Sequence, residues 1–180
     1  AGSTDSLNYL YQYKDGVISF LEMKRGGEGG FKSMLDVEGV FYGVGMGVSE
    51  QNEKGEILFT HLSDEEQIWC TSIAQHNGKL WVGTKDGMRI YEDKKITNPF
   101  EKDINLSGAI TSLAQWGSET LLVGTKTSGV LVVQGDTVCA VLSEEEGLSS
   151  NLIKSLHVDR DGVVWAGTNK GLNRIDFRPS

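Results

Sequence analysis

The chain has 180 residues, of which 38% are hydrophobic, so it is long and apolar enough for one good-sized domain with a buried core. Its net charge of −8 argues against nucleic-acid binding, which needs clustered Lys and Arg, and against contact with an anionic membrane surface. No apolar run reaches the roughly 18 residues that a membrane-spanning helix requires. The 23 glycines and two prolines favour many tight turns between strands.

The chain begins with two strand-like runs, Leu7–Tyr13 and Val17–Phe20. They have the character of the last two strands of a four-stranded unit whose beginning is missing. We therefore expect residues 1–20 to form a partial unit made of outer strands.

One phrase then recurs four times, as an apolar run that ends in a shared glycine. The four glycines, Gly43, Gly83, Gly124 and Gly167, are 40, 41 and 43 residues apart. A period near forty residues, built from short apolar runs, is typical of the blades of a β-propeller. No segment has sustained helical periodicity, so the sequence predicts an all-β fold.

Each copy contains the same elements in the same order. A first strand carries a serine, a polar turn follows, and a second strand ends in the shared glycine. A short connection ends in a second glycine, and a third and a fourth strand complete the blade. The serines are Ser33, Ser72, Ser112 and Ser155, the second glycines are Gly47, Gly87, Gly129 and Gly171, and the expected fourth strands are Ile57–Thr60, Ile96–Phe100 and Thr137–Val141.

The sequence thus predicts about four repeats of four-stranded antiparallel sheets within a single propeller region, 1–180. The blades span 31–60, 68–100 and 110–141, and the last, 153–177, lacks its outer strand. We favour a segment of a larger propeller, and a closed ring of four or five blades is the alternative. An open segment would expose apolar blade faces, so a homodimer or contact with further blades is expected.

Several residues that suggest chemistry have a simpler structural interpretation. Small serines suit strands that crowd toward the propeller axis, and we expect their hydroxyls to bond nearby backbone. Cys70 and Cys139 are expected to be buried, reduced thiols, and Trp81 and Trp165 to lie in the core. Asp159 starts a turn that fits an Asx turn better than a calcium loop. We expect no metal, no cofactor and no catalytic residue.

The segment from Gly147 to Asp176 resembles the two-component regulator propeller repeat. It has the lead-in Gly147-Leu148-Ser149-Ser150-Asn151, the turn His157-Val158-Asp159-Arg160-Asp161-Gly162, and the strand phrases Val164-Trp165-Ala166-Gly167-Thr168 and Gly171-Leu172-Asn173-Arg174-Ile175. Ser150 replaces the usual proline of the repeat. The resemblance implies the extracytoplasmic, periplasmic sensor region of a bacterial hybrid two-component histidine kinase, whose usual ligands are oligosaccharides.

In a propeller, the loops between second and third strands emerge on the same face as the connections between blades, and ligands commonly bind there. The candidate ligand-binding residues in these loops are Lys85, Asp86, Lys126, Thr127, Asn169 and Lys170. The three lysines would form a cationic ring for a carboxylated or sulfated sugar, and solvated turn residues are the alternative. Trp69 starts a blade beside this face and is the aromatic candidate, whereas Trp116 is expected in a turn on the opposite face.

Three functions are compatible with these patterns. The first is a non-catalytic ligand-sensing module of a signalling receptor. The second is a polysaccharide lyase or glycosidase, which needs facing carboxylates; Asp86 and Glu144–Glu146 are the only candidates. The third is a protein-interaction scaffold.

Overall fold

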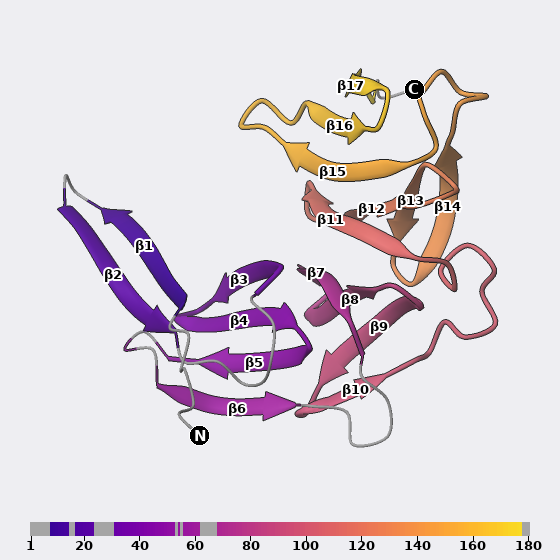
Figure 1. Cartoon of the computed structure of the whole chain (residues 1–180). Coiled ribbons are helices and arrows are strands. Elements are labelled where there is room, and N and C mark those ends of the chain that lie inside the picture. Colours follow the sequence, from indigo (N-terminus) through magenta and orange to yellow (C-terminus); the bar gives the residue numbers. More distant parts are fainter. Residues whose placement is uncertain are drawn as a thin grey trace, which may run out of the picture. The chain divides into compact units, whose positions relative to one another are not determined.

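The computed structural model describes residues 8–14, 17–23, 31–52, 54, 56–61 and 68–177. In these ranges the fold is all-β, built from open antiparallel sheets without a helix (Figure 1), as predicted. The chain divides into two compact units, Ala1–Cys70 and Thr71–Ser180. Each unit is described by itself.

The first unit contains a hairpin and one blade. The hairpin pairs β1 (Asn8–Lys14) with β2 (Val17–Met23). The first blade has the order β3 (Ser33–Val37), β4 (Val40–Gly45), β5 (Gly47–Gln51) and β6 (Ile57–His61). Its first turn has positive φ at Glu38 (52°) and Gly39 (81°), the geometry of a tight type I′ hairpin.

The second unit contains three blades, and each follows the strand order of the chain. The second blade is β7 (Cys70–His76), β8 (Lys79–Thr84), β9 (Gly87–Glu92) and β10 (Lys95–Thr97). The third blade is β11 (Ile110–Trp116), β12 (Thr120–Thr125), β13 (Val130–Gln134) and β14 (Thr137–Leu142). The fourth blade is β15 (Ile153–Val158), β16 (Val164–Thr168) and β17 (Gly171–Ile175).

Two apolar clusters hold these three blades together. Trp81, Met88, Ile110, Leu121 and Leu131 belong to the cluster that joins the second and third blades. Leu122, Val130, Ile153 and Val164 belong to the cluster that joins the third and fourth. All six residues of β12 are buried because the third blade has a neighbour on both faces, whereas β14 is largely exposed at its outer edge.

The shared glycine of the repeat leaves room for the first strands that pack closely against it. A Cβ added at Gly83 would lie 2.6 Å from Ser72 Oγ and 2.7 Å from Ile110 Cγ2. Ser72 belongs to the same blade and Ile110 to the next one. The Thr71 hydroxyl adds a polar link, 2.8 Å from the Ile110 carbonyl oxygen. Blade stacking therefore requires glycine at this position.

The expectation that the repeated serines bond to backbone is wrong for two of them. Ser72 Oγ and Ser112 Oγ are buried and have no hydrogen-bond partner. Each hydroxyl oxygen lies where a Cβ on the glycine opposite would meet it, Ser72 at Gly83 and Ser112 at Gly124. The small serine side chain fits this close contact, but its hydroxyl makes no hydrogen bond.

Other side chains differ from expectation because of their place in a blade. Cys70 is buried, but Cys139 is exposed, since β14 is an outermost strand with a neighbour on one side only. Trp81 is buried as predicted, and Trp165 is half-buried rather than in the core. The fourth strand of the second blade ends at Thr97, before Pro99, and Phe100 turns inward to stack on Trp81 with ring centroids 4.8 Å apart.

Candidate functional site

The candidate site of the second unit is formed by three short loops that join second to third strands. They are residues 85–86, 126–128 and 169–170. In each, the preceding threonine closes the loop: the hydroxyl groups of Thr84, Thr125 and Thr168 donate to the carbonyl of the following second glycine at 2.7, 2.8 and 2.8 Å. The same hydroxyl oxygens accept the amides of Asp86, Ser128 and Lys170. The repeated Gly-Thr phrase thus fixes the loop backbone.

Each blade's connection to the next lies beside these loops. We call the residues before the first strand of the third and fourth blades, 103–109 and 143–152, the lead-in segments. The Met88 amide donates to the Leu106 carbonyl at 2.8 Å, the Lys126 amide to Ala109 at 3.0 Å, and the Gly129 amide to Asn151 at 2.9 Å. Loops and lead-in segments therefore form one surface, which we call the loop face.

The three lysines of the loop face have different surroundings. Lys170 Nζ lies 3.1 Å from Glu144 Oε1, and this hydrogen bond lowers the pKa of the Glu144 carboxyl. Lys85 Nζ lies 4.0 Å from its neighbour Asp86. Lys126 is exposed and forms no ion pair with any residue that the structure describes. Two of the three charges are thus matched locally, and Lys126 is the unmatched cation.

The fourth blade's lead-in segment is built by its own side chains. Glu146 accepts the amide and the hydroxyl of Ser143 at 2.8 and 2.7 Å, which lowers the pKa of the Glu146 carboxyl. The Glu144 amide donates to Asn151 Oδ1 at 2.7 Å. The Ser143-x-x-Glu146 spacing is the signal of such a cap, whereas the prediction from the sequence was limited to candidate catalytic carboxylates at Glu144–Glu146.

A second network attaches this lead-in segment to the fourth blade. The Ser149 amide donates to Asn173 Oδ1 at 3.0 Å, and the Ser149 and Thr168 hydroxyl oxygens are 2.9 Å apart. Asn173 Nδ2 also donates to Ser149 Oγ at 2.8 Å. The sequence analysis did not single out Asn173, although it lies within the Gly171–Ile175 phrase of the repeat.

The two tryptophans compared as ligand contacts, Trp69 and Trp116, belong to different units of the chain. Trp69 lies in the first unit, where it forms an isolated β-bridge with Met46 and is 39% exposed. Trp116 is the last residue of β11 rather than part of a turn. It packs on Phe177 with ring centroids 4.4 Å apart, and its Nε1 donates to the Gly162 carbonyl at 2.9 Å. Trp116 therefore links the third and fourth blades.

Asp159 organises the turn of the fourth blade. Its Oδ1 accepts the amides of Asp161 and Val163, both at 2.9 Å, and its Oδ2 accepts Trp165 Nε1 at 2.9 Å. The Trp165 hydrogen bond is the largest cause of the lowered pKa of Asp159. The predicted Asx turn is confirmed, and both carboxylate oxygens are used inside the hairpin.

Residues 147–170, which cover part of the fourth blade's lead-in segment, its first two strands and the turn between them, match the family described as two component regulator propeller. The match is confined to this one stretch of the chain. The residues of this repeat that hold the lead-in segment, Ser149 and Thr168, and the turn, Asp159 and Trp165, lie within the match.

Solved structures with a similar fold include three from bacterial proteins. The extracellular domain of the hybrid two-component system BT3049 of B. thetaiotaomicron is 24% identical, with a TM-score of 0.67 over 96% of this chain and 26% of that chain. The extracellular domain of BT4673 of the same organism is 19% identical, with a TM-score of 0.70 over 96% and 25%. PorZ, a surface component of the type IX secretion system of Porphyromonas gingivalis, is 15% identical, with a TM-score of 0.63 over 90% and 28%.

These likenesses show the propeller fold, and the chain spans about a quarter of the length of each of those structures. No curated protein sequence matches the chain. Nowhere in the described ranges does the structure contain a helix long and apolar enough to cross a membrane.

Proposed function

We propose that this chain is a non-catalytic, ligand-sensing propeller segment of a two-component signalling receptor, placed on the periplasmic side of the inner membrane, and that its ligand is an oligosaccharide. The two-component regulator propeller repeat at 147–170 supports the receptor class. The likeness to the extracellular domains of BT3049 and BT4673 of B. thetaiotaomicron supports the location. In such a receptor, ligand binding would shift the populations of two packing arrangements and so bias the output.

The observation that carries the proposal is the combination of a fixed backbone and exposed polar side chains on the loop face. The threonine hydrogen bonds hold each loop in one conformation, so little entropy is lost when a ligand binds there. Lys126, Thr127 and Asn169 are exposed on these loops. The unmatched ammonium of Lys126 fits the carboxylate or sulfate of an acidic sugar, and the neighbouring polar groups fit hydroxyls.

The test is calorimetry with oligogalacturonides, sulfated disaccharides and neutral oligosaccharides as probes. We expect Lys126→Ala to weaken binding of an acidic probe by about tenfold, which corresponds to roughly 1.4 kcal/mol. Lys95→Ala, an exposed lysine on the outer strand β10, is the matched control and should leave affinity unchanged. Equal effects of the two substitutions would show that the loop face is not the binding site. If no probe bound, an oligosaccharide would be excluded as the ligand.

The electrostatics of the loop face favour a sensor over a glycosidase. A general acid needs a carboxyl whose pKa is raised, whereas the pKa values of Glu144 and Glu146 are lowered by their hydrogen bonds to Lys170 and Ser143. Both side chains already hold the lead-in segment. An assay for reducing ends or unsaturated products, run on the same probes, should show no release, and product formation would overturn the non-catalytic assignment.

A further inference from the structure

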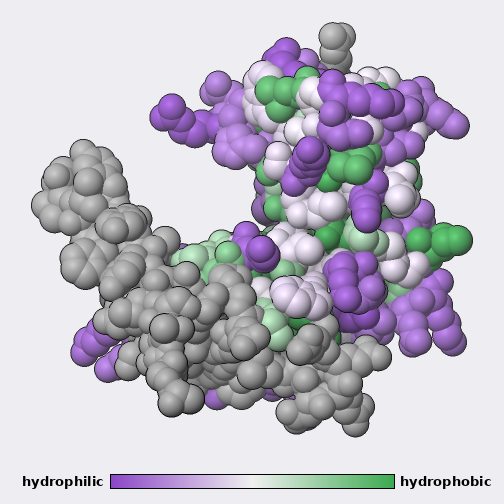
Figure 2. All heavy atoms as spheres, in the orientation of Figure 1, coloured by the Kyte–Doolittle hydropathy of each residue, from purple (hydrophilic) through white to green (hydrophobic). Residues whose placement is uncertain are grey.

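His76 is the one His, Lys, Arg, Asp or Glu side chain that is buried among the residues that the structure describes. It is 2% exposed and is the last residue of β7, the first strand of the second blade. Figure 2 shows hydrophilic side chains at the surface of the second unit, over the fourth blade and over the segment that follows β10. A basic group in a core destabilises the fold unless neighbouring groups replace the water that it has lost. The partners of this ring are therefore informative.

Both ring nitrogens of His76 face oxygen atoms of the third blade. Nδ1 lies 3.2 Å from Gln115 Oε1, near the end of β11. Nε2 lies 3.2 Å from the Gly135 carbonyl oxygen, in the turn between β13 and β14. These partners are 39 and 59 residues away in the chain. The ring thus joins the second blade to two different hairpins of the third.

The Gln115 side chain has only its oxygen to offer to the ring. Its Nε2 donates to the carbonyl oxygens of Gly117 and Ser118, at 3.0 and 3.2 Å. Turning the amide over would set Oε1 against these two carbonyl oxygens, which have no hydrogen to donate. The Gly135 carbonyl is also an acceptor only. His76 therefore has one acceptor at each of its two nitrogens.

The number of protons on the ring decides how many of these acceptors are satisfied. A neutral imidazole has one N–H, whereas the imidazolium has two. A neutral His76 donates to either Gln115 or Gly135, and its other nitrogen then directs a lone pair at the remaining oxygen. The charged ring donates to both, and both hydrogen bonds are then charge-assisted. The geometry around the ring thus matches its doubly protonated form.

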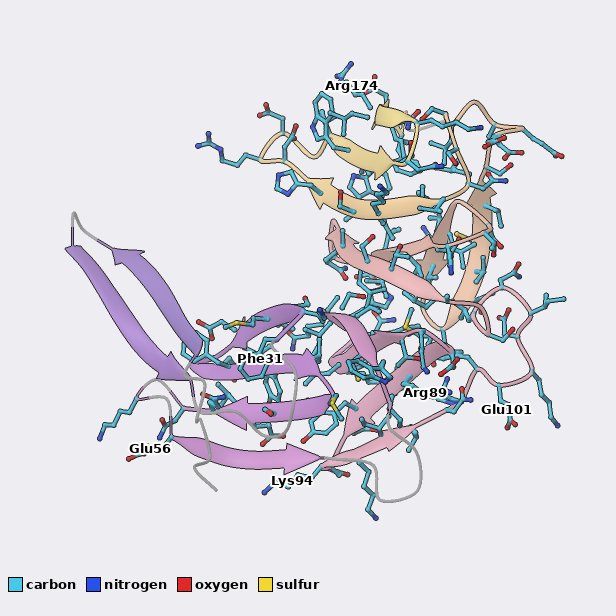
Figure 3. The ribbon with its side chains drawn as sticks, viewed as in Figure 1. Phe31, Glu56, Arg89, Lys94, Glu101 and Arg174 are labelled. Carbon is cyan, nitrogen blue, oxygen red and sulfur yellow. The ribbon has the colours of Figure 1, made fainter. Side chains whose placement is uncertain are left out.

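The charged groups at this end of the second and third blades reach solvent. Lys79 Nζ and Asp136 Oδ2 lie 3.6 Å apart, and their side chains are 40% and 57% exposed. Arg89 and Glu101 lie elsewhere, beside the segment that follows β10 (Figure 3). The titratable side chains on the strand ends and turns at the His76 end are Lys79, Glu92, Asp93, Lys94, Lys95, Glu119 and Asp136. No ion pair joins a carboxylate to His76 in the described part of the chain, so its two acceptors are neutral oxygens.

We propose that His76 is a proton-dependent joint between the second and third blades. The joint is complete when the ring carries both protons, because only then do Gln115 and Gly135 each receive a donor. Raising the pH through the range in which histidine loses a proton, about pH 5 to 8, removes one of the two hydrogen bonds. The stability that depends on this proton is therefore present at the acid end of that range and declines as the pH rises. This inference concerns how two blades are held together and does not depend on the ligand proposed above.

The direct test is NMR of the unaltered chain with labelled histidine ring nitrogens. The chemical shifts of these nitrogens distinguish the imidazolium from both neutral tautomers, and His76→Gln identifies which signals belong to His76. At about pH 5.5 we expect both His76 nitrogens to be protonated and their hydrogens to exchange slowly with water. The exposed His157 is the reference for a ring in solvent. A His76 ring that stays neutral at this pH while His157 is charged would overturn the proposal.

Urea unfolding at several pH values measures the consequence for stability. Between about pH 5 and 8, we expect the unfolding equilibrium constant of the original chain to rise at least about threefold more than that of Gln115→Ala. In this variant a neutral ring can still donate to Gly135, so its second proton has no acceptor to gain. His157→Gln, which removes an exposed histidine, is the matched control and should keep the pH dependence of the original. The same pH dependence in Gln115→Ala and the original chain would also overturn the proposal.

Discussion

The shared glycines of the repeat allow a sharp stability test, because Gly83 and Gly167 differ in one neighbouring residue. Gly83 and Gly167 each have a serine Oγ of their own blade 2.6 Å from the position of an added Cβ. At Gly83 the Cβ would also meet Ile110 Cγ2 at 2.7 Å and Ile110 Cβ at 3.1 Å. Comfortable carbon contacts lie at about 3.5–4.0 Å. Gly83→Ala therefore pushes two blades apart, and Gly167→Ala does not.

The expected magnitudes follow from two opposing terms. Overpacking a well-filled core costs about 1–3 kcal/mol, and replacing a strand glycine with alanine returns about 0.5–1 kcal/mol. We expect Gly83→Ala to destabilise the second unit by about 1–2 kcal/mol, which lowers the melting temperature by about 5–10 °C for a unit of this size. At Gly167 the exposed Ser155 can turn aside, so stability should stay within about 0.5 kcal/mol of the original.

The assay is thermal and urea unfolding of the two variants side by side. A double-mutant cycle identifies the contact: in an Ile110→Ala background the cost of Gly83→Ala should fall by about 1 kcal/mol, because Cγ2 is gone. Equal shifts for Gly83→Ala and Gly167→Ala would refute the reasoning, since both would then report only on the contact within one blade.

Three other predictions concern the polar framework. Thr125→Val removes the hydroxyl that closes a buried loop and should cost about 1–2 kcal/mol in urea unfolding, with exposed Thr127→Val as a near-neutral control. His76 is 2% exposed, its ring nitrogens lie 3.2 Å from Gln115 Oε1 and 3.2 Å from the Gly135 carbonyl oxygen, and its ring packs edge-on against Trp81, so His76→Ala should lose about 1–3 kcal/mol because a buried ring and its hydrogen bonding are removed; an unchanged unfolding midpoint would contradict this. The pKa of Asp159 is lowered on folding, so its stabilisation is present above about pH 4 and is lost as the pH falls through the folded value. Asp159→Asn should therefore flatten the decline of melting temperature below pH 4, and an identical decline in both proteins would count against the Asx turn as its source.

The features that the sequence predicted well are local ones. The forty-residue period predicted blades, and the polar turn expected between first and second strands forms in the second blade with φ of 51° at Asn77 and 72° at Gly78. The apolar run before each shared glycine was predicted to be a strand, and β12 is such a strand. Such features depend on the backbone preferences and side-chain alternation of neighbouring residues, so a short window of sequence is sufficient to read them.

The features that failed or were missed depend on residues from other repeats. The three loop lysines look equivalent in sequence, but Glu144, from a different connection, pairs with Lys170 and leaves Lys126 unmatched. The role of Asn173 follows from the approach of Ser149, 24 residues earlier in the chain. Cys139 is exposed because its strand lies outermost in its blade. None of these neighbours can be inferred from the composition of a single repeat.

The sequence alone therefore determined that the chain forms propeller blades, with the order of the strands, the turns and the small residues of the inner strand. Tertiary structure decided which copies of the same residue are covered: Met88 and Leu172 occupy one position of the repeat and are 0% and 68% exposed. The reason is that the burial of a residue depends on what packs against it. Met88, for example, is covered by Leu106 from the segment before the next blade. The repeat thus specifies where a residue lies within its blade, and only the neighbouring segment determines whether that residue is buried.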